Sequence, residues 1–548
     1  MLVSNIKSKI MGNKNKYLIF IILLAFILTF LIFYKNSTGD VLGRFHRDVY
    51  LYLIQSLAFD GFYFNQYSYI NSLSPLVPFL TSLLFRLGFV SEVSIFFVTS
   101  VLFGFSIIGM FYLLKLRFDD IYSVLGVAVY CSFTVIMMWA GNGTIDIPSI
   151  SLCILGIYFF IKSLDNQKYF YLSLPLLMLS ITAKYTVIAN ILIIFVYFLS
   201  KGNVINNVKK YYKNFIGGFL VSLLCLIPFI YFYITHNVFN EAATYFSDVS
   251  STTGVNDFLF YILNINKIIF RYNDFVGLVY VIIMLVGVVF SLYCLYRILK
   301  FYYVDSSGLD SFKDKLLYLV LFGSIVGLVV DFLLTSTSDI KLCLVLFYVF
   351  ICSFTLSFNK VLVRYNKVSG DKYSTFSYDI LMFAWFGSQF IFLSTFTVKT
   401  YRYGIAFVPP LVFFITYGFK RICEFVSESN VGRKKFLYIC ICCLLLVSFG
   451  HFAVDNSDNW VVDEKQTVEW LKSNVDLDNV NIWSDRPVYA WYLQKDYHYV
   501  DNRGDVNNLS RDMLNASADY YISHEPNLVI PHYSKFKVIG SVTIFKCD

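Results

Sequence analysis

The sequence predicts an all-α protein that crosses a membrane many times and carries a small α/β domain near its C-terminus. Hydrophobic residues make up 57% of the 548 positions and charged residues only 15%. That leaves too few polar side chains to cover a soluble protein of this length. Apolar runs of roughly 20 residues, the length of a spanning helix, recur along the chain. After residue 454 the runs stop and charged residues become frequent.

Apolar runs predict about thirteen spanning helices. They lie near residues 17–34, 93–116, 121–139, 147–163, 169–183, 185–200, 215–235, 275–299, 316–334, 341–358, 377–397, 404–419 and 436–454. The first run follows several lysines and lacks an A-x-A cleavage site, so we expect a retained signal anchor. A shorter stretch at 75–87, interrupted by Pro78 and Arg86, predicts an interfacial helix.

Loop charge predicts the direction of the spans. With the N-terminus in the cytoplasm, basic residues gather in the inner loops near 201–213, 360–372 and 420–435. This agrees with the positive-inside rule for a multi-pass plasma-membrane protein. The net charge of +8 therefore indicates helix orientation and not nucleic-acid binding. Long loops at 35–92 and 236–274 then lie outside, as does the C-terminal domain.

Three parts are expected: a cytoplasmic tail at 1–16, a membrane domain at 17–454 and an extracytoplasmic α/β domain at 455–548. In the last part, periodicity predicts helices near 464–474 and 486–494. Strand-like runs alternate with them, at Val480–Trp483, Asp519–Ser523 and Val538–Phe545. The cysteines lie mostly in apolar runs, so neither a disulfide framework nor a zinc site is expected.

Two acids at the outer edge of the membrane are functional candidates, because charge there is costly. Asp48 follows His46 and precedes Tyr50 at the start of the first outer loop. It suits a general base for a hydroxyl or a ligand for a divalent cation; the alternative is a solvated acid paired with a nearby arginine. Asp146 lies two residues before Pro148, so a helix N-cap is the alternative or an additional role.

Two cations lie on the same side. Lys184 lies between two apolar runs, outside and against the positive-inside trend; the alternative is a snorkelling lysine. Arg402 lies between Tyr401 and Tyr403, and the alternative is an interfacial cation in an aromatic belt. A guanidinium can also clamp a phosphate by two parallel hydrogen bonds. Two carboxylates and two cations on one face indicate a phosphate-bearing substrate, with or without a metal.

The order of these features resembles the GT-C glycosyltransferases, in particular protein O-mannosyltransferases and lipid A aminoarabinose transferases. The resemblance covers roughly residues 17–454. The elements that carry it are Asp48 near Tyr50, Ser74-Pro75-Leu76 before an interfacial helix, Asp146 before the fourth span, Thr182-Ala183-Lys184, and Arg402-Tyr403 followed by Pro409. The chain departs from the pattern where an acidic pair and a Pro-Pro-Leu form are usual.

The resemblance implies a GT-C fold and a sugar donor carried on polyprenyl or dolichyl phosphate. Asp48 would deprotonate an acceptor hydroxyl, which attacks the anomeric carbon with inversion. Lys184 and Arg402 would hold the departing lipid phosphate, and Asp146 would support the site. His46, Tyr50 and Tyr403 are supporting candidates. The cofactor expectation is either none or a divalent cation, Mg or Mn, on Asp48 and Asp146. The sugar, a hexose or a pentose, stays open.

A secondary transporter or lipid flippase is the alternative from another class. It would show inverted repeats and broken helices near the midplane. The runs here are mostly uninterrupted and the charges cluster at one boundary, with Asp331 as the main exception. A scaffold or receptor would leave the boundary charges unexplained. Transfer of a whole oligosaccharide to asparagine is disfavoured, since Trp483-Ser484-Asp485 does not match the WWDYG motif of those enzymes.

Overall fold

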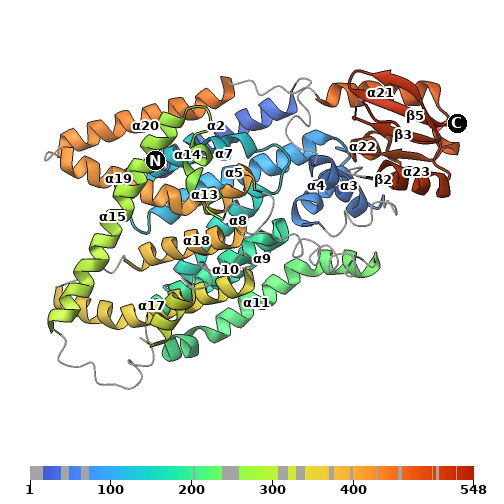
Figure 1. The fold of residues 1–548 in the computed structure, drawn as a ribbon. Helices are drawn as coiled ribbons and strands as arrows, with labels where there is room; N and C mark the ends of the chain where they lie inside the picture. The colour runs from blue at the N-terminus through green and yellow to red at the C-terminus, as the bar shows by residue number, and fades with distance from the viewer. Residues whose placement is uncertain are drawn as a thin grey trace, which may run out of the picture.

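A long helical bundle with a β-sheet at one end makes up the computed structural model (Figure 1). The structure describes residues 16–38, 48–62, 73–201, 204–236, 238, 258–305, 319–328, 340–369, 376–394, 399–426, 430–453, 460–495, 498–500, 505–525 and 527–548. His46 and Asp331 lie outside these residues.

Each predicted span falls on a helix. The long helices are α2 (Lys16–Ser37), α5 (Glu92–Leu114), α6 (Asp120–Ser132), α8 (Asp146–Ser163), α9 (Phe170–Ala183), α10 (Ile188–Ser200), α11 (Val204–Thr235), α15 (Asp274–Asp305), α17 (Ile340–Ser369), α18 (Phe376–Ser394), α19 (Val408–Val426) and α20 (Asn430–Ala453). The short helix α7 (Thr134–Trp139) follows α6. Within the run at 316–334, the described residues 319–328 are helical. The run at 121–139 divides into α6 and α7 at Phe133, whose backbone is extended. Among the described residues, eight helices are long and apolar enough to cross a membrane. The predicted polytopic α-helical fold is confirmed.

Burial separates inner helices from outer ones. The apolar stretches of α5, α8, α18 and Tyr401–Val426 are 67–78% buried. Those of α2, α11, α15 and α20 are only 22–28% buried. The outer helices therefore present apolar side chains outward, as lipid requires. Short helices connect the long ones: η2 (Gln167–Tyr169), η3 (Tyr185–Val187), α13 (Phe260–Leu263), α14 (Ile265–Ile269) and η4 (Tyr401–Phe407). A further one, η5 (Leu477–Asn479), lies in the C-terminal domain.

The first outer loop holds two helices, of which the sequence predicted one. The predicted interfacial helix is α4 (Leu76–Arg86). The other, α3 (Asp48–Asp60), was missed, because its 13 residues are too few to span a bilayer and residues 49–59 show no polar face. Nearly all of α3 is buried. Its end is held by Arg86, which donates to the Phe59 carbonyl over 2.6 Å.

The C-terminal α/β domain has a five-stranded sheet in the order β2-β1-β3-β5-β4. Its elements are α21 (Trp460–Asn474), β1 (Ile482–Ser484), α22 (Val488–Leu493), β2 (His498–Tyr499), α23 (Val506–Asn515), β3 (Tyr520–Ser523), β4 (Tyr533–Ile539) and β5 (Val542–Cys547). β1 is parallel to β2 and β3, whereas β5 is antiparallel to β3 and β4. The single strand predicted at Val538–Phe545 is wrong, since Gly540 at φ +56° turns the chain between β4 and β5.

This domain packs directly on the first outer loop, where Figure 1 shows α22 beside α3 and α4. Leu53 of α3 and Val488 of α22 belong to one buried apolar cluster. The rings of Phe85 on α4 and Trp491 on α22 stack with centroids 5.9 Å apart. The domain therefore shares a core with the helix that begins at Asp48.

Candidate functional site

Four segments that are distant in sequence bring Asp48, Asp146, Lys184 and Arg402 into one cluster. Arg402 lies between the two carboxylates: its Nη1 donates to Asp48 Oδ2 over 3.0 Å, and its Nε lies 2.8 Å from Asp146 Oδ2. The second contact is an ion pair without hydrogen-bond alignment. Lys184 Nζ donates to the other oxygen of Asp146. All four predicted charges therefore meet, and they form one connected network.

Helix ends supply the two acids. Asp48 is the first residue of α3, and Asp146 is the first residue of α8. A carboxylate in the first turn of a helix is favoured by the helix dipole. The expected cap role of Asp146 is not seen, because the N-cap position is Ile145 and no side chain caps α8. The ion pairs with Arg402 and Lys184 occupy the Asp146 carboxylate instead.

Gly143 lets the two acids approach each other. It lies three residues before Asp146, and its φ of +82° is one that L side chains rarely adopt. A Cβ at this position would lie 2.9 Å from Val49 Cγ1, next to Asp48 on α3. The missing side chain therefore allows α3 to pack against the segment that leads into α8.

The two cations, Lys184 and Arg402, lie where the backbone departs from regular α-helix. Lys184 follows the last residue of α9 and is extended, at φ −158° and ψ 116°. Arg402 lies in η4, which leads into α19. Pro409 and Pro410 follow in the first turn of α19, where their missing N–H groups leave no helical hydrogen bond unmade. Both cations thus come from irregular backbone between apolar helices.

The cluster is almost withdrawn from solvent and is balanced in charge. Side-chain exposure is 2% for Asp146, 9% for Arg402 and 15% for Lys184, against 29% for Asp48. Two positive and two negative groups offset one another, and a buried ionic group needs such partners to avoid a large desolvation cost. Asp48 is the most accessible of the four and is the one placed to meet a second molecule.

Aromatic rings cover the cations. Lys184 Nζ lies 4.8 Å from the Tyr403 ring centroid, and the Arg402 guanidinium lies 5.0 Å from that of Trp139. Sequence reasoning missed Trp139; its only signal was a tryptophan at the outer end of the run at 121–139. Tyr50, a predicted supporting residue, contacts Tyr492 of the C-terminal domain, 3.2 Å between hydroxyl oxygens.

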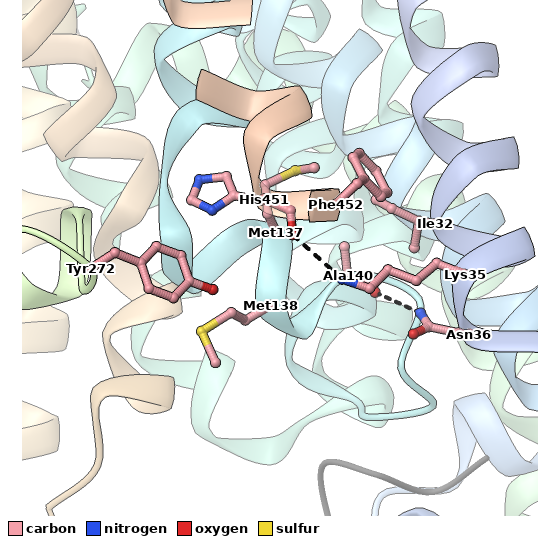
Figure 2. Close-up of a pocket in the computed structure, with 9 residues that line it drawn as sticks. All are labelled: Ile32, Lys35, Asn36, Met137, Met138, Ala140, Tyr272, His451 and Phe452. Atoms are coloured by element: carbon pink, nitrogen blue, oxygen red, sulfur yellow. Dashed lines mark hydrogen bonds between the residues drawn. The ribbon is translucent and has the colours of Figure 1, made fainter. Parts of the chain in front are cut away.

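Of two small cavities in the bundle, one adjoins the cluster. The first opens between Asp146 and Lys184 and is lined in addition by Ser149, Ile150, Thr186, Val187, Leu393, Tyr403, Ile405 and Ala406. The second, shown in Figure 2, lies between α2, α7 and α20. There Lys35 donates to the His451 carbonyl over 3.4 Å and Asn36 to that of Ala140 over 3.3 Å. These donors serve carbonyls at the ends of α20 and α7, so the second cavity is part of the packing between helices.

The charges of the cluster do not fit a resident divalent cation. Arg402 occupies the position between Asp48 and Asp146 that a bridging ion would need. A metal there would also face Lys184. Among the described residues, no group of three or more His, Cys, Asp or Glu side chains could hold a metal. The Mg or Mn expectation remains a prediction, and no chemical step below depends on it.

Comparison with known proteins finds one matching family model and solved structures of similar fold. Residues 72–232 match the family model of the dolichyl-phosphate-mannose-protein mannosyltransferases. ArnT from Cupriavidus metallidurans bound to undecaprenyl phosphate aligns with a TM-score of 0.54 and 9% identity, over 96% of this chain and 97% of that one. The archaeal oligosaccharyltransferase AglB from Archaeoglobus fulgidus, in complex with an inhibitory peptide and a dolichol-phosphate, aligns with a TM-score of 0.53 and 11% identity. That alignment covers 93% of this chain and 69% of AglB.

A search of curated proteins finds no match to the sequence. The structural matches, at about a tenth of residues identical, establish the fold. The chain has the fold of the GT-C glycosyltransferases, and the resemblance predicted from its sequence is confirmed at that level.

Proposed function

We propose that this GT-C-fold chain is an inverting membrane glycosyltransferase, which moves a sugar from a polyprenyl- or dolichyl-phosphate donor to a hydroxyl acceptor on the outer face. The proposal is carried by one observation: four charged side chains lie in contact, those of Asp48, Asp146, Lys184 and Arg402. The two acids begin α-helices, and the two cations lie in irregular backbone between helices. The undecaprenyl phosphate and dolichol-phosphate held by the two structural neighbours support a lipid-phosphate donor.

Asp48 is the proposed general base. It is more exposed than Asp146, at 29% against 2% of the side chain, so an acceptor hydroxyl can reach it. Asp48 takes the hydroxyl proton while the oxygen attacks the anomeric carbon. The bond from that carbon to the phosphate oxygen breaks on the opposite face, and the lipid phosphate leaves. General-base catalysis typically contributes ~10²–10⁴-fold to the rate.

Arg402 and Lys184 are the proposed phosphate ligands. Arg402 has five N–H donors, of which Nη1 donates to Asp48 and Nε lies beside Asp146 without hydrogen-bond alignment. A lipid phosphate entering beside Arg402 competes with Asp48 for the guanidinium, and that exchange would free the carboxylate to accept a proton. Asp146 stays between the two cations and holds them together when the phosphate leaves.

The proposed orientation puts this chemistry outside the cell. The tail at 1–16 would be cytoplasmic, the membrane domain would cover 17–454 and the domain at 455–548 would face outward, with loops 35–92 and 236–274. The support is the excess of Lys and Arg in the loops assigned to the inside.

A transfer assay tests the proposal. The purified protein in lipid nanodiscs is incubated with a panel of polyprenyl-phosphate sugars and candidate hydroxyl acceptors. Mass spectrometry should show one sugar moved to an acceptor and free polyprenyl phosphate released. Asp48→Asn should lower transfer by about 10²-fold or more, the range of a lost general base. Asp60→Asn is the matched control, because Asp60 ends the same helix and pairs only loosely with Arg86, at 3.7 Å. Wild-type transfer by Asp48→Asn would remove Asp48 from the role.

A further inference from the structure

The seam between α3 and the C-terminal domain holds a polar link that the proposed chemistry does not use. Tyr50 on α3 is fully buried, and its hydroxyl lies 3.2 Å from that of Tyr492, which belongs to α22. The two ring centroids are 5.8 Å apart. Tyr492 is only partly buried, so the pair lies at the edge of the shared apolar core and not in its middle.

A third polar group faces the same pair. Glu92, the first residue of α5, is 9% exposed and forms a side-chain hydrogen bond with Tyr492, while its Oε1 has no hydrogen-bond partner among the described residues. Burial first, and then the nearby Tyr50 and Glu92, raise the pKa of the Tyr492 phenol. Burial likewise raises the pKa of Tyr50. Both hydroxyls therefore keep their protons at physiological pH, and the seam is a neutral hydrogen-bonded contact beside one carboxylate.

α22 offers a rigid support for this contact. Arg486, two residues before α22, donates to Glu464 of α21 over 2.7 Å. His524 follows β3. Its Nε2 lies 2.9 Å from Glu464 Oε1, and its Nδ1 lies 2.9 Å from Asp485 Oδ1. These contacts tie α21, the end of β1 and the end of β3 together at the point where α22 begins. The cluster therefore anchors the start of the helix that carries Tyr492.

α3 needs such support because it is short. Isolated helices below ~12–15 residues are marginal in water, so α3 owes its position to packing. Tyr50 and Asp48 are two residues apart in one helix, a rise of about 3 Å, and a shift of one is passed to the other. A misplacement of ~1 Å at a reacting group can cost ~10²-fold in rate.

We propose that Tyr492 is a positioning residue for Asp48: through the Tyr50 hydroxyl it holds α3 in the register at which Asp48 meets Arg402 and the acceptor. The C-terminal domain is then a working part of the catalytic apparatus. The inference rests on the proposed function for its readout, but it concerns residues and a domain to which that function assigns no role.

Removal of single hydroxyls tests the inference on the full-length protein in nanodiscs. Tyr492→Phe and Tyr50→Phe should each lower kcat by about 3- to 10-fold, the effect of one hydrogen bond, and leave the donor KM unchanged. The double variant should be no slower than Tyr492→Phe alone, because that substitution already removes the link between Tyr492 and Tyr50. Tyr533→Phe is the matched control: it removes a buried hydroxyl of the same domain that donates to the Ala518 carbonyl over 2.7 Å, away from α3.

The outcomes separate the two proposals. Absence of transfer by the wild type overturns the proposed function. If the wild type transfers sugar and Asp48→Asn does not, three results overturn the positioning role alone. These are a wild-type kcat in Tyr492→Phe, full additivity in the double variant, or an equal loss of kcat in Tyr533→Phe. Thermal unfolding of each variant shows whether a loss of kcat follows a loss of folded protein.

Discussion

Arg402 is the residue on which the site depends. Its guanidinium contacts both acids and stacks near Trp139, so one side chain joins α3, α8, α7 and η4. Lysine cannot reproduce this arrangement, because an ammonium is a point charge without the planar fork that reaches two carboxylates. The length and shape of Arg402, as well as its charge, therefore position Asp48.

Arg402→Lys and Arg402→Ala should both lower kcat/KM for the donor. We expect a loss of ~10²–10³-fold for alanine, the cost of removing a donor to a developing charge, and a smaller but clear loss for lysine. Donor titration of transfer rates measures this. The control is Arg421→Lys, which alters an ion pair with Glu424 on α19 whose side chains are 31% and 33% exposed. Donor kinetics that stay at the wild-type level in Arg402→Ala would contradict the phosphate-clamp role.

Metal removal should leave transfer intact. The four charges already balance and Arg402 occupies the place of a bridging ion, so EDTA should change the rate by less than about twofold. Rates before and after chelation, with Mg and Mn added back, measure this. Loss of transfer that either metal restores would contradict the fit of these charges and support a cation on Asp48 and Asp146.

At the scale of elements, the approach of α3 to the start of α8 decides whether the acids meet. Both helices are anchored elsewhere: α3 in the shared core with α22, and α8 among the inner helices. Between them lies the turn at Gly143, whose positive φ and missing side chain make room for Val49. This turn is the point where the distance between Asp48 and Asp146 is most easily changed.

Gly143→Ala should separate these elements. The new methyl would lie 2.9 Å from Val49 Cγ1 at a strained φ, so we expect destabilisation on the order of 1–3 kcal/mol and a fall in kcat. Thermal unfolding and transfer rates measure the two effects. Gly450→Ala is the matched control, since nothing lies within 4 Å of a Cβ there, and it should be neutral or slightly stabilising. Equal behaviour of the two variants would contradict the steric argument.

The cluster of His524 makes the stability of the C-terminal domain depend on pH. Burial alone would lower the pKa of His524, but hydrogen bonds to Asp485 and Glu464 outweigh it and raise the pKa above 6.5. For Asp485, burial is outweighed by the hydrogen bonds and charge of His524, and the pKa falls below 3.8. The histidine contribution is therefore complete below pH 6.5 and lost as pH rises through the raised value. The aspartate contribution is present above pH 3.8 and lost on further acidification.

The unfolding temperature of the domain should therefore fall as pH increases above about 6.5. His524→Gln should lower the unfolding temperature at pH 6 and flatten its dependence on pH. Intrinsic fluorescence of the full-length protein measures this, because Trp483 and Trp491 lie within the domain. A wild-type pH dependence in His524→Gln would contradict the assignment to this histidine.

At the scale of the whole molecule, the inner helices carry the charged site and the outer helices expose apolar surface. Inner segments carry Asp146 and Arg402, whereas outer helices such as α11 and α15 expose most of their apolar surface. The sheet lies at one end of the bundle, next to the helix that begins at Asp48 (Figure 1). Site and domain therefore lie at the same end of the bundle, which loop charge predicts to be the outer one.

Protease added to sealed right-side-out vesicles should cut within residues 455–548 and leave the inner loop at 201–213 intact. The reason is that the positive-inside rule assigns these segments to opposite sides. Mass spectrometry of the released peptides measures this, with opened vesicles as the control in which both segments are cut. Protection of the C-terminal domain in sealed vesicles would overturn the orientation.

Sequence by itself determined the long apolar helices, because a backbone in lipid must satisfy its hydrogen bonds within each helix and this forces long apolar runs. It also predicted that Asp48, Asp146, Lys184 and Arg402 lie at one boundary of the membrane, since loop charge orders the spans. Only the tertiary structure decided that Arg402 bridges both acids and that Tyr50 meets Tyr492 of the C-terminal domain. Contacts between residues more than 250 positions apart depend on how helices pack, and neither periodicity nor charge in a linear chain encodes that packing locally.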